Sequence, residues 1–310
     1  MTAEPQINVF IDIAVCTFRR PELRETLISL FALDVPDRVA VRLIVADNDE
    51  RPSARDLVDS LREHSPFPIS YVHCPKSNIS IARNACLTES DGEFLAFIDD
   101  DEVAAPSWLS ELYEAHIKSG ADAVLGPVRA IYSASAPGWM RKGDFHSTRP
   151  VWVNGHIRTG YTCNVLLDMR SPHLSNRRFD LALGQSGGED TQFFSAMTRD
   201  GGRIAFAANA RLEEPVPAKR ESFDWLSKRR FRSGQTHGRI LATQHHGAAR
   251  LIQAFIASCK LGCCALLMAL SVPFPIARYR YALRAALHAG VVTGLFGKRE
   301  IRQYGFVEAS

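Results

Sequence analysis

The sequence predicts an α/β protein with a mainly parallel sheet, followed by a helical C-terminal region. Within residues 9–130, short apolar runs rich in β-branched residues alternate with stretches of helical spacing, as in βαβ units. From about residue 223 onward the pattern is helical and the charge is basic. The 310 residues are 46% hydrophobic and 23% charged, an average globular composition that excludes a disordered or collagen-like chain.

Five apolar runs in the first part of the chain are expected to be strands. They are residues 9–16, 39–46, 69–73, 94–98 and 123–130. Helices are expected after Pro21, after Ser53 as a cap, and after Ser107.

Residues 131–185 lose this alternation and are rich in Gly, Pro, Trp, His and Arg. They predict a substrate-facing region with short antiparallel strands around residues 160–167. A helix is then expected from about residue 189 to 199, and a strand at 203–207.

Charge is divided unevenly along the chain. Residues 1–214 carry 22 Lys and Arg against 30 Asp and Glu, a net charge of −8, whereas residues 215–310 carry 15 against 4, a net charge of +11. A basic end on an acidic body predicts contact with an anionic partner. The basic stretch at residues 227–237 is too short to predict binding to nucleic acid.

The cysteines and the N-terminus predict a cytoplasmic protein. The seven cysteines lie mostly in apolar runs and lack the regular spacing of a disulfide framework. The first residues lack the basic and apolar pattern of a signal peptide.

Residues 251–276 form a mostly apolar stretch that Lys260 interrupts and that Pro273 and Pro275 end. A membrane span needs ~20 apolar residues without such interruptions. We favour helices that lie on a membrane surface with Arg and Lys facing anionic head groups. A buried helical hairpin and a true span are the alternatives.

Four acids, Asp99 to Glu102, directly follow an expected buried strand. In a parallel sheet, ligands bind at the carboxyl ends of the strands. Mutual repulsion weakens the fold there unless a cation lies among the acids, and oxygen ligands suit Mg²⁺ or Mn²⁺. An acidic loop that caps the next helix is the alternative interpretation.

Gly187, Gly188, Glu189 and Asp190 come just before an expected helix. The two glycines allow a tight turn, and the backbone amides of the first helical turn hold a carboxylate in place. Such a carboxylate can accept a proton from an alcohol and make it a nucleophile. Helix capping alone is again the alternative.

The order and spacing of five segments resemble glycosyltransferase family 2, which comprises inverting enzymes with a GT-A fold. The segments are residues 13–21 (IAVCTFRRP), 45–49 (VADND), 78–84 (NISIARN), 97–102 (FIDDDE) and 188–190 (GED). The resemblance covers about residues 9–240. It implies a GT-A catalytic domain over residues 1–222, with a nucleotide half at about 9–130 and an acceptor half at about 131–222. Residues 223–310 would form a basic, helical, membrane-associated region.

The resemblance also implies roles for single residues. Thr17 and Asp47 match positions that hold the nucleoside, and Arg83 matches a basic residue near the nucleotide. Asp99 and Asp101 match the DxD pair, in which the second acid holds the metal.

Three acids in a row leave the register of that pair open by one residue, so Asp100 is the alternative for its first acid. Asp190 matches the catalytic base. Glu213 stands where relatives often carry a histidine near the metal.

Contacts with the phosphates and the acceptor are expected from four further residues. These are Glu189, Arg230, Arg232 and His237.

The function implied is inverting transfer of a sugar from a UDP-sugar, with UDP-glucose as the expected donor and Mg²⁺ or Mn²⁺ as cofactor. The expected acceptor is a lipid-linked oligosaccharide at the cytoplasmic face of the inner membrane, where the protein would be peripheral. A noncatalytic sugar-nucleotide-binding protein is one alternative. A nucleotidyltransferase is another, although residues 17–21 lack the glycines of a phosphate loop.

Overall fold

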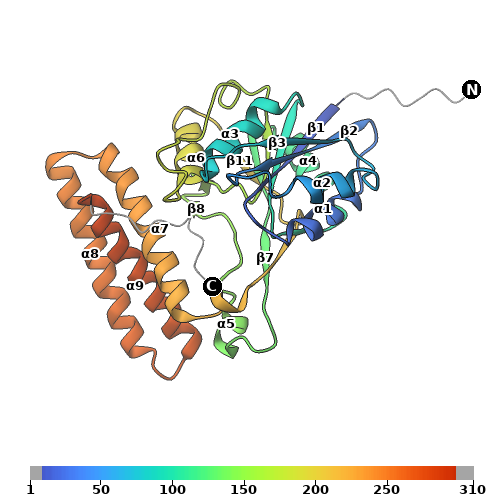
Figure 1. Cartoon of the computed structure of the whole chain (residues 1–310). Coiled ribbons are helices and arrows are strands. Elements are labelled where there is room, and N and C mark those ends of the chain that lie inside the picture. The colour runs from blue at the N-terminus through green and yellow to red at the C-terminus, as the bar shows by residue number, and fades with distance from the viewer. Residues whose placement is uncertain (1–8, 298–310) are drawn as a thin grey trace, which may run out of the picture. The chain divides into compact units, whose positions relative to one another are not determined.

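The computed structural model describes residues 9–297, and their contacts divide this range into two units (Figure 1). The first unit comprises residues 9–129 and 147–214, and the second comprises 130–146 and 215–297. Residues 131–146, which the sequence assigned to an acceptor half, therefore belong with the C-terminal helices.

A seven-stranded mixed sheet forms the centre of the first unit. Its order is β11 (Ile204–Phe206), β6 (Ala123–Leu125), β10 (Asn164–Asp168), β4 (Phe94–Asp99), β1 (Val9–Thr17), β2 (Val39–Asp47) and β3 (Ile69–His73). The pairs β1–β2, β1–β4, β2–β3 and β6–β11 are parallel, whereas β10 runs antiparallel to β4 and β6. The mixed, mainly parallel α/β class is thus confirmed.

Helices cover both faces of this sheet, which explains why its strands are apolar on both sides. One core cluster joins the sheet to α1 (Leu23–Phe31), α2 (Arg55–Arg62) and α4 (Trp108–Ser119). The other joins it to α3 (Ile79–Glu89) and α6 (Glu189–Arg199). Along β1, Ile13 packs into the first cluster and Ala14 into the second, as strand alternation requires.

Short elements complete the first unit and lead into the second. The pair β8 (Trp152–Val153) and β9 (His156–Ile157) is antiparallel, and β5 (Val103–Ala104), β12 (Leu212–Pro215) and β7 (Val128–Ile131) form a small sheet. In the second unit α5 (Gly138–Gly143) and a 3₁₀ turn (Ala218–Arg220) precede the long helices.

Three local expectations need correction. The strand expected at 123–130 is two strands, because β6 belongs to the seven-stranded sheet and β7 to the three-stranded sheet, with residues 126–127 in neither. The residue before α2 is Ala54, so Ser53 is not its cap. The structure also adds α3, whose cap Asn78 accepts hydrogen bonds from two backbone N–H groups.

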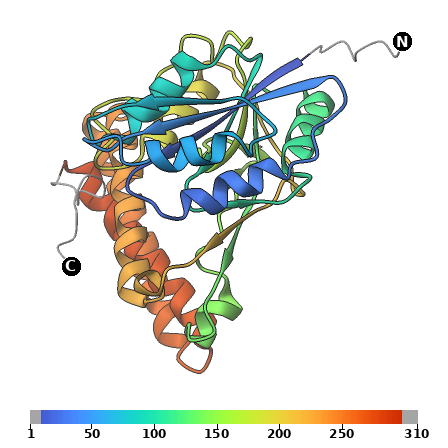
Figure 2. The ribbon, with the colours of Figure 1, turned by 45° about the vertical axis from the view of Figure 1, so that its right-hand side comes forward.

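The second unit is built on three long helices, α7 (Phe223–Gln244), α8 (Gly247–Leu270) and α9 (Pro275–Leu295). Helix α9 packs against both α7 and α8 (Figure 2). On the α7 side the backbones approach closely, because Gly234 and Gly238 of α7 face carbonyl oxygens of α9. Reciprocally, Gly290 and Gly294 of α9 face carbonyl oxygens of α7.

Substituting Gly290 by Ala is expected to destabilise the protein. A Cβ at this position would lie 1.9 Å from the Phe231 carbonyl oxygen, so the two helices must separate. The expected loss is ~1–3 kcal/mol, the usual cost of overpacking. Gly262→Ala on α8 is the control, because no atom lies within 4 Å of its added Cβ. Thermal unfolding of the two variants measures the difference, and equal melting temperatures would contradict the close α7–α9 packing.

Candidate functional site

Three strands end in polar residues at one edge of the sheet. Thr17 pairs in register with Asp47, and Cys16 pairs with Asp99. Because β1, β2 and β4 are parallel, their carboxyl ends bring residues far apart in sequence to one place. The structure therefore brings together Thr17, Asp47 and the acids that begin at Asp99.

The acids after β4 are crowded. The Asp100 and Asp101 side chains are only 11% and 12% exposed, whereas the Asp99 side chain is 45% exposed. Burial raises the pKa of Asp99 to about 6, with Asp101 and Glu214 adding to the rise and Arg83 opposing it. Burial and the charge of Asp101 raise the pKa of Asp100 to about 7. The pKa of Glu102 lies well above its usual value because of burial and the charge of Asp99. This negative charge favours binding of a cation.

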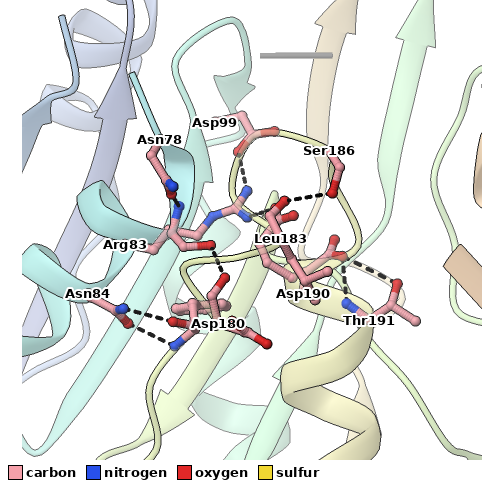
Figure 3. A network of polar contacts seen from close by, with 12 residues as sticks. Asn78, Arg83, Asn84, Asp99, Asp180, Leu183, Ser186, Asp190 and Thr191 are labelled. Atoms are coloured by element: carbon pink, nitrogen blue, oxygen red, sulfur yellow. Dashed lines mark hydrogen bonds and ion pairs between the residues drawn. The ribbon is translucent and has the colours of Figure 1, made fainter. Parts of the chain in front are cut away.

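Arg83 connects these acids to the start of α6 (Figure 3). Its guanidinium forms an ion pair with Glu189 and lies 4.0 Å from the nearest Asp99 oxygen. Both the Arg83 and the Glu189 side chains are almost fully buried. One Glu189 oxygen, Oε2, has no hydrogen-bond partner in the structure.

Hydrogen bonds to α3 explain how residues 83 and 189 meet. Asn78 donates to the Leu181 carbonyl, Ser80 donates to the Asp180 carbonyl, and Asn84 exchanges two hydrogen bonds with the Phe179 backbone. These bonds hold residues 179–181 on the first turns of α3, as the contacts drawn in Figure 3 illustrate. The chain that continues to α6 is thereby brought over Arg83.

Asp190 lies next to this ion pair on the first turn of α6. The preceding Gly187 and Gly188 have φ angles of 86° and 93°, which favour glycine. Burial raises the pKa of Asp190 to about 6, with Glu189 adding to the rise, while Arg83 and hydrogen bonds from Thr191 oppose it. A carboxylate with this pKa is ionised near neutral pH and still basic enough to accept a proton.

Asp47 is fully buried and its oxygens are already engaged. They accept hydrogen bonds from the Asp49 and Ala54 N–H groups and from the Tyr71 hydroxyl. Asp47 therefore orders the loop after β2. An N–H group of a nucleobase would have to bind a carboxylate lone pair of Asp47 that these hydrogen bonds leave open. Thr17 is also buried, and its hydroxyl oxygen has no hydrogen-bond partner in the structure.

Glu213 lies away from the acid cluster. Its side chain is half exposed and its carboxylate is 3.4 Å from Arg129. Along β12 the alternation places Glu214 on the other side of the strand, and it is the charge of Glu214 that contributes to the raised pKa of Asp99 and of Glu102. Glu214 is therefore the glutamate of β12 whose charge acts on these acids, and a role of Glu213 near a metal stays a prediction.

Arg230, Arg232 and His237 all lie on α7, in the second unit. Their expected contacts with phosphates stay predictions. Burial and the neighbouring Arg229 lower the pKa of Arg230.

The acid cluster fits a divalent cation. Its donors are carboxylate oxygens, the ligands that Mg²⁺ and Mn²⁺ prefer, and the raised pKa values indicate negative charge that a cation would neutralise. Among the described residues, the ligand atoms of Asp99, Glu102 and Cys163 lie within 4.8 Å of one another. Asp101, the expected metal ligand, lies 3.5 Å from Arg20, and its role as a ligand stays a prediction.

Sequence reasoning missed two charged residues close to these acids, Glu214 and Arg20. Glu214 could be recognised only from the side of β12 on which it lies. Arg20 stands in the segment after β1, and the two adjacent arginines there were the available signal.

The comparisons with known proteins agree with the geometry. The sequence model described as Glycosyl transferase family 2 matches residues 12–180. The chain is 58% identical over 306 residues to the "Succinoglycan biosynthesis protein ExoM" of Rhizobium meliloti (strain 1021), with 99% of both chains covered.

Two solved structures share the fold at low identity. The mannosyltransferase PcManGT from Pyrobaculum calidifontis, in complex with GDP-Man and Mn²⁺, matches with a TM-score of 0.63 and 16% identity, over 96% of this chain and 91% of that chain. The 1–349 segment of S. aureus TarS, in complex with UDP, matches with a TM-score of 0.53 and 16% identity, over 96% and 94%.

Breaking the Arg83–Glu189 pair is expected to destabilise the protein strongly. Arg83→Met or Glu189→Gln leaves the partner buried without its counter-charge, at a cost of ~3–5 kcal/mol. The double variant should lose less than the sum of the two, because neither charge remains alone. Urea unfolding of all four proteins measures this coupling. Glu114→Gln, which removes an exposed ion pair with Lys118, should change stability by less than ~1 kcal/mol. Strict additivity of the two buried substitutions would show that the pair is not formed.

Proposed function

Because the chain belongs to glycosyltransferase family 2, we propose that it transfers a sugar, with inversion, from a UDP-sugar to a lipid-linked oligosaccharide. The relative named for succinoglycan biosynthesis supports a place in bacterial exopolysaccharide synthesis. Glucose is the sugar that we propose. The observation that carries the proposal is Arg83, which joins the acids after β4 to the carboxylates that begin α6.

The donor is proposed to bind at the carboxyl edge of the sheet. UDP in the TarS complex and GDP-Man with Mn²⁺ in the PcManGT complex support a nucleotide and a divalent cation. Asp101, with Asp99 or Asp100, would hold Mg²⁺ or Mn²⁺, which when bound neutralises charge on the leaving diphosphate. Thr17 and Asp47 would line the nucleoside, and Arg83 would orient the groups around it.

Asp190 is proposed as the general base. Its carboxylate accepts the proton of the acceptor hydroxyl as that oxygen attacks the anomeric carbon from the face opposite the leaving UDP. The attack forms the new glycosidic bond, breaks the bond to UDP and inverts the anomeric centre. A raised pKa supports this role, because a base works best with a pKa near the operating pH.

The second unit is proposed to bind an anionic membrane surface. Helix α8 packs Ala254 and Ala257 against α9, and its other side exposes large apolar residues. These are Leu251, Ile252, Phe255, Ile256, Leu266 and Leu270. Residues 225–297 contain ten Lys and Arg and no Asp or Glu, so their charge complements anionic head groups.

This helix is long and apolar enough to cross a membrane by length and composition, and little of it is buried. The exposure of α8 argues against the buried helical hairpin. An interfacial helix on the cytoplasmic face accounts for the apolar side and for the basic charge together.

Asp190→Asn is expected to lower turnover by ~10²–10⁴-fold, because the amide cannot accept the proton. UDP binding, measured by calorimetry with Mn²⁺, should stay nearly unchanged. Asp200→Asn, after the end of the same helix, is the control for a lost carboxylate and should keep its activity. Equal losses of turnover and UDP affinity in Asp190→Asn would assign it to binding rather than to proton transfer.

The pH profile of kcat should show an acidic limb near pH 6. Since Asp190 must be ionised to accept a proton and its pKa is about 6, activity rises as pH increases through that value. Saturating donor and Mn²⁺ keep the acids after β4 ionised, so the limb reports the base. A limb near pH 4, the ordinary value for aspartate, would contradict the environment described for Asp190.

Flotation with vesicles tests the membrane proposal. At low salt the protein should float with phosphatidylglycerol vesicles and much less with phosphatidylcholine vesicles. Leu251→Ser/Phe255→Ser should weaken this binding by ~10-fold or more, because two large apolar side chains no longer enter the interface. Ile117→Ser, an exposed apolar residue of α4, is the matched control. If the natural protein did not float with phosphatidylglycerol vesicles, the proposal of membrane binding would be contradicted.

A further inference from the structure

Two adjacent arginines follow β1, and they reach different acids. Arg19 forms two hydrogen bonds with the Asp49 carboxylate, at 2.8 and 2.7 Å. Its φ of 55° lies in the left-handed region, which is strained for a non-glycine residue. This conformation persists because the surrounding contacts hold it.

Arg20 extends to the acids after β4. Its Nε atom lies 3.8 Å from an Asp100 oxygen, and its NH1 atom lies 3.5 Å from an Asp101 oxygen. The Phe18 N–H group also donates to Asp100, so this carboxylate is contacted by two residues of the turn after β1. About a third of the Arg20 side chain is exposed, which leaves it free to move without opening the core.

The two sides of the acid run therefore have different cationic neighbours. Asp100 and Asp101 face Arg20, whereas Asp99 faces Arg83 and lies with Glu102. The contacts at 3.5 and 3.8 Å are longer than a close ion pair. Arg20 therefore offsets the charge of these acids without fixing the positions of their side chains.

We propose that Arg20 is an internal counter-cation that competes with the divalent cation for Asp100 and Asp101, and that the diphosphate of the donor draws it away. This inference rests on the proposed function, because it assumes that a diphosphate binds beside these acids. The guanidinium matches phosphate oxygens with two parallel hydrogen bonds, so the diphosphate offers Arg20 a better partner.

Cooperativity between metal and donor follows. In the absence of donor, the positive charge of Arg20 opposes a second cation on the same oxygens, and metal binds weakly. When Arg20 moves to the diphosphate, its charge no longer repels the metal from these oxygens. The bound diphosphate then attracts the metal. By linkage, the nucleotide strengthens metal binding by the same factor as the metal strengthens nucleotide binding.

Mn²⁺ binding, followed by the electron paramagnetic resonance signal of free Mn²⁺, tests this on the full chain with and without UDP. The natural protein should bind Mn²⁺ weakly alone and at least ~10-fold more tightly with UDP. Arg20→Gln should bind Mn²⁺ alone ~10-fold more tightly than the natural protein and lose most of the enhancement by UDP. Arg20→Lys keeps the charge and should retain weak binding of Mn²⁺ alone.

Arg24→Gln, an exposed arginine of α1, is the matched control and should resemble the natural protein. Melting temperatures provide a second measurement, because Mn²⁺ alone should stabilise Arg20→Gln more than the natural protein. Unchanged or weaker Mn²⁺ binding by Arg20→Gln would overturn the inference and leave the proposed function standing. Absence of UDP-dependent Mn²⁺ binding in the natural protein would overturn both.

Discussion

Crowding of carboxylates at the carboxyl ends of β1 and β4 is the constraint on which the rest of the site depends. Parallel strands bring Asp99, Asp100 and Asp101 next to the turn after β1, and burial withholds from Asp100 and Asp101 much of the water that would screen their charges. Two arginines, Arg20 and Arg83, partly balance this charge. The negative charge that remains lowers the stability of the fold and favours binding of a cation.

Arg83 also joins the acids after β4 to the first turn of α6, which carries the proposed base. Its buried pair with Glu189 fixes the start of α6, and Asp190 follows directly. The hydrogen bonds between α3 and residues 179–181 make this possible, since they bring two segments about a hundred residues apart onto one surface. The position of Asp190 and its proton affinity therefore both depend on the Arg83–Glu189 pair and on the hydrogen bonds that bring these segments together.

Much of the fold followed from local patterns, because apolar runs and helix starts are local properties. The strands around Phe94–Asp99 and the helix at Glu189–Arg199 were predictable in this way. Features that depend on contacts between segments far apart in sequence could not be predicted in this way. The choice between Glu213 and Glu214 depends on the side of β12 that faces the acids, and the assignment of residues 131–146 to the helical unit depends on packing between segments far apart in sequence. Family resemblance identified Arg83 as basic and near a nucleotide, but its buried partner Glu189 emerged only from the fold.

The central claim is that the acids after β4 hold UDP through a divalent cation. Calorimetric titration of UDP into the natural protein and into Asp101→Ala, each with Mg²⁺ and with a chelator, tests it most directly. The account predicts tight binding by the natural protein with Mg²⁺, weaker binding with the chelator, and no effect of Mg²⁺ in the variant. Equal UDP affinity in all four titrations would contradict it.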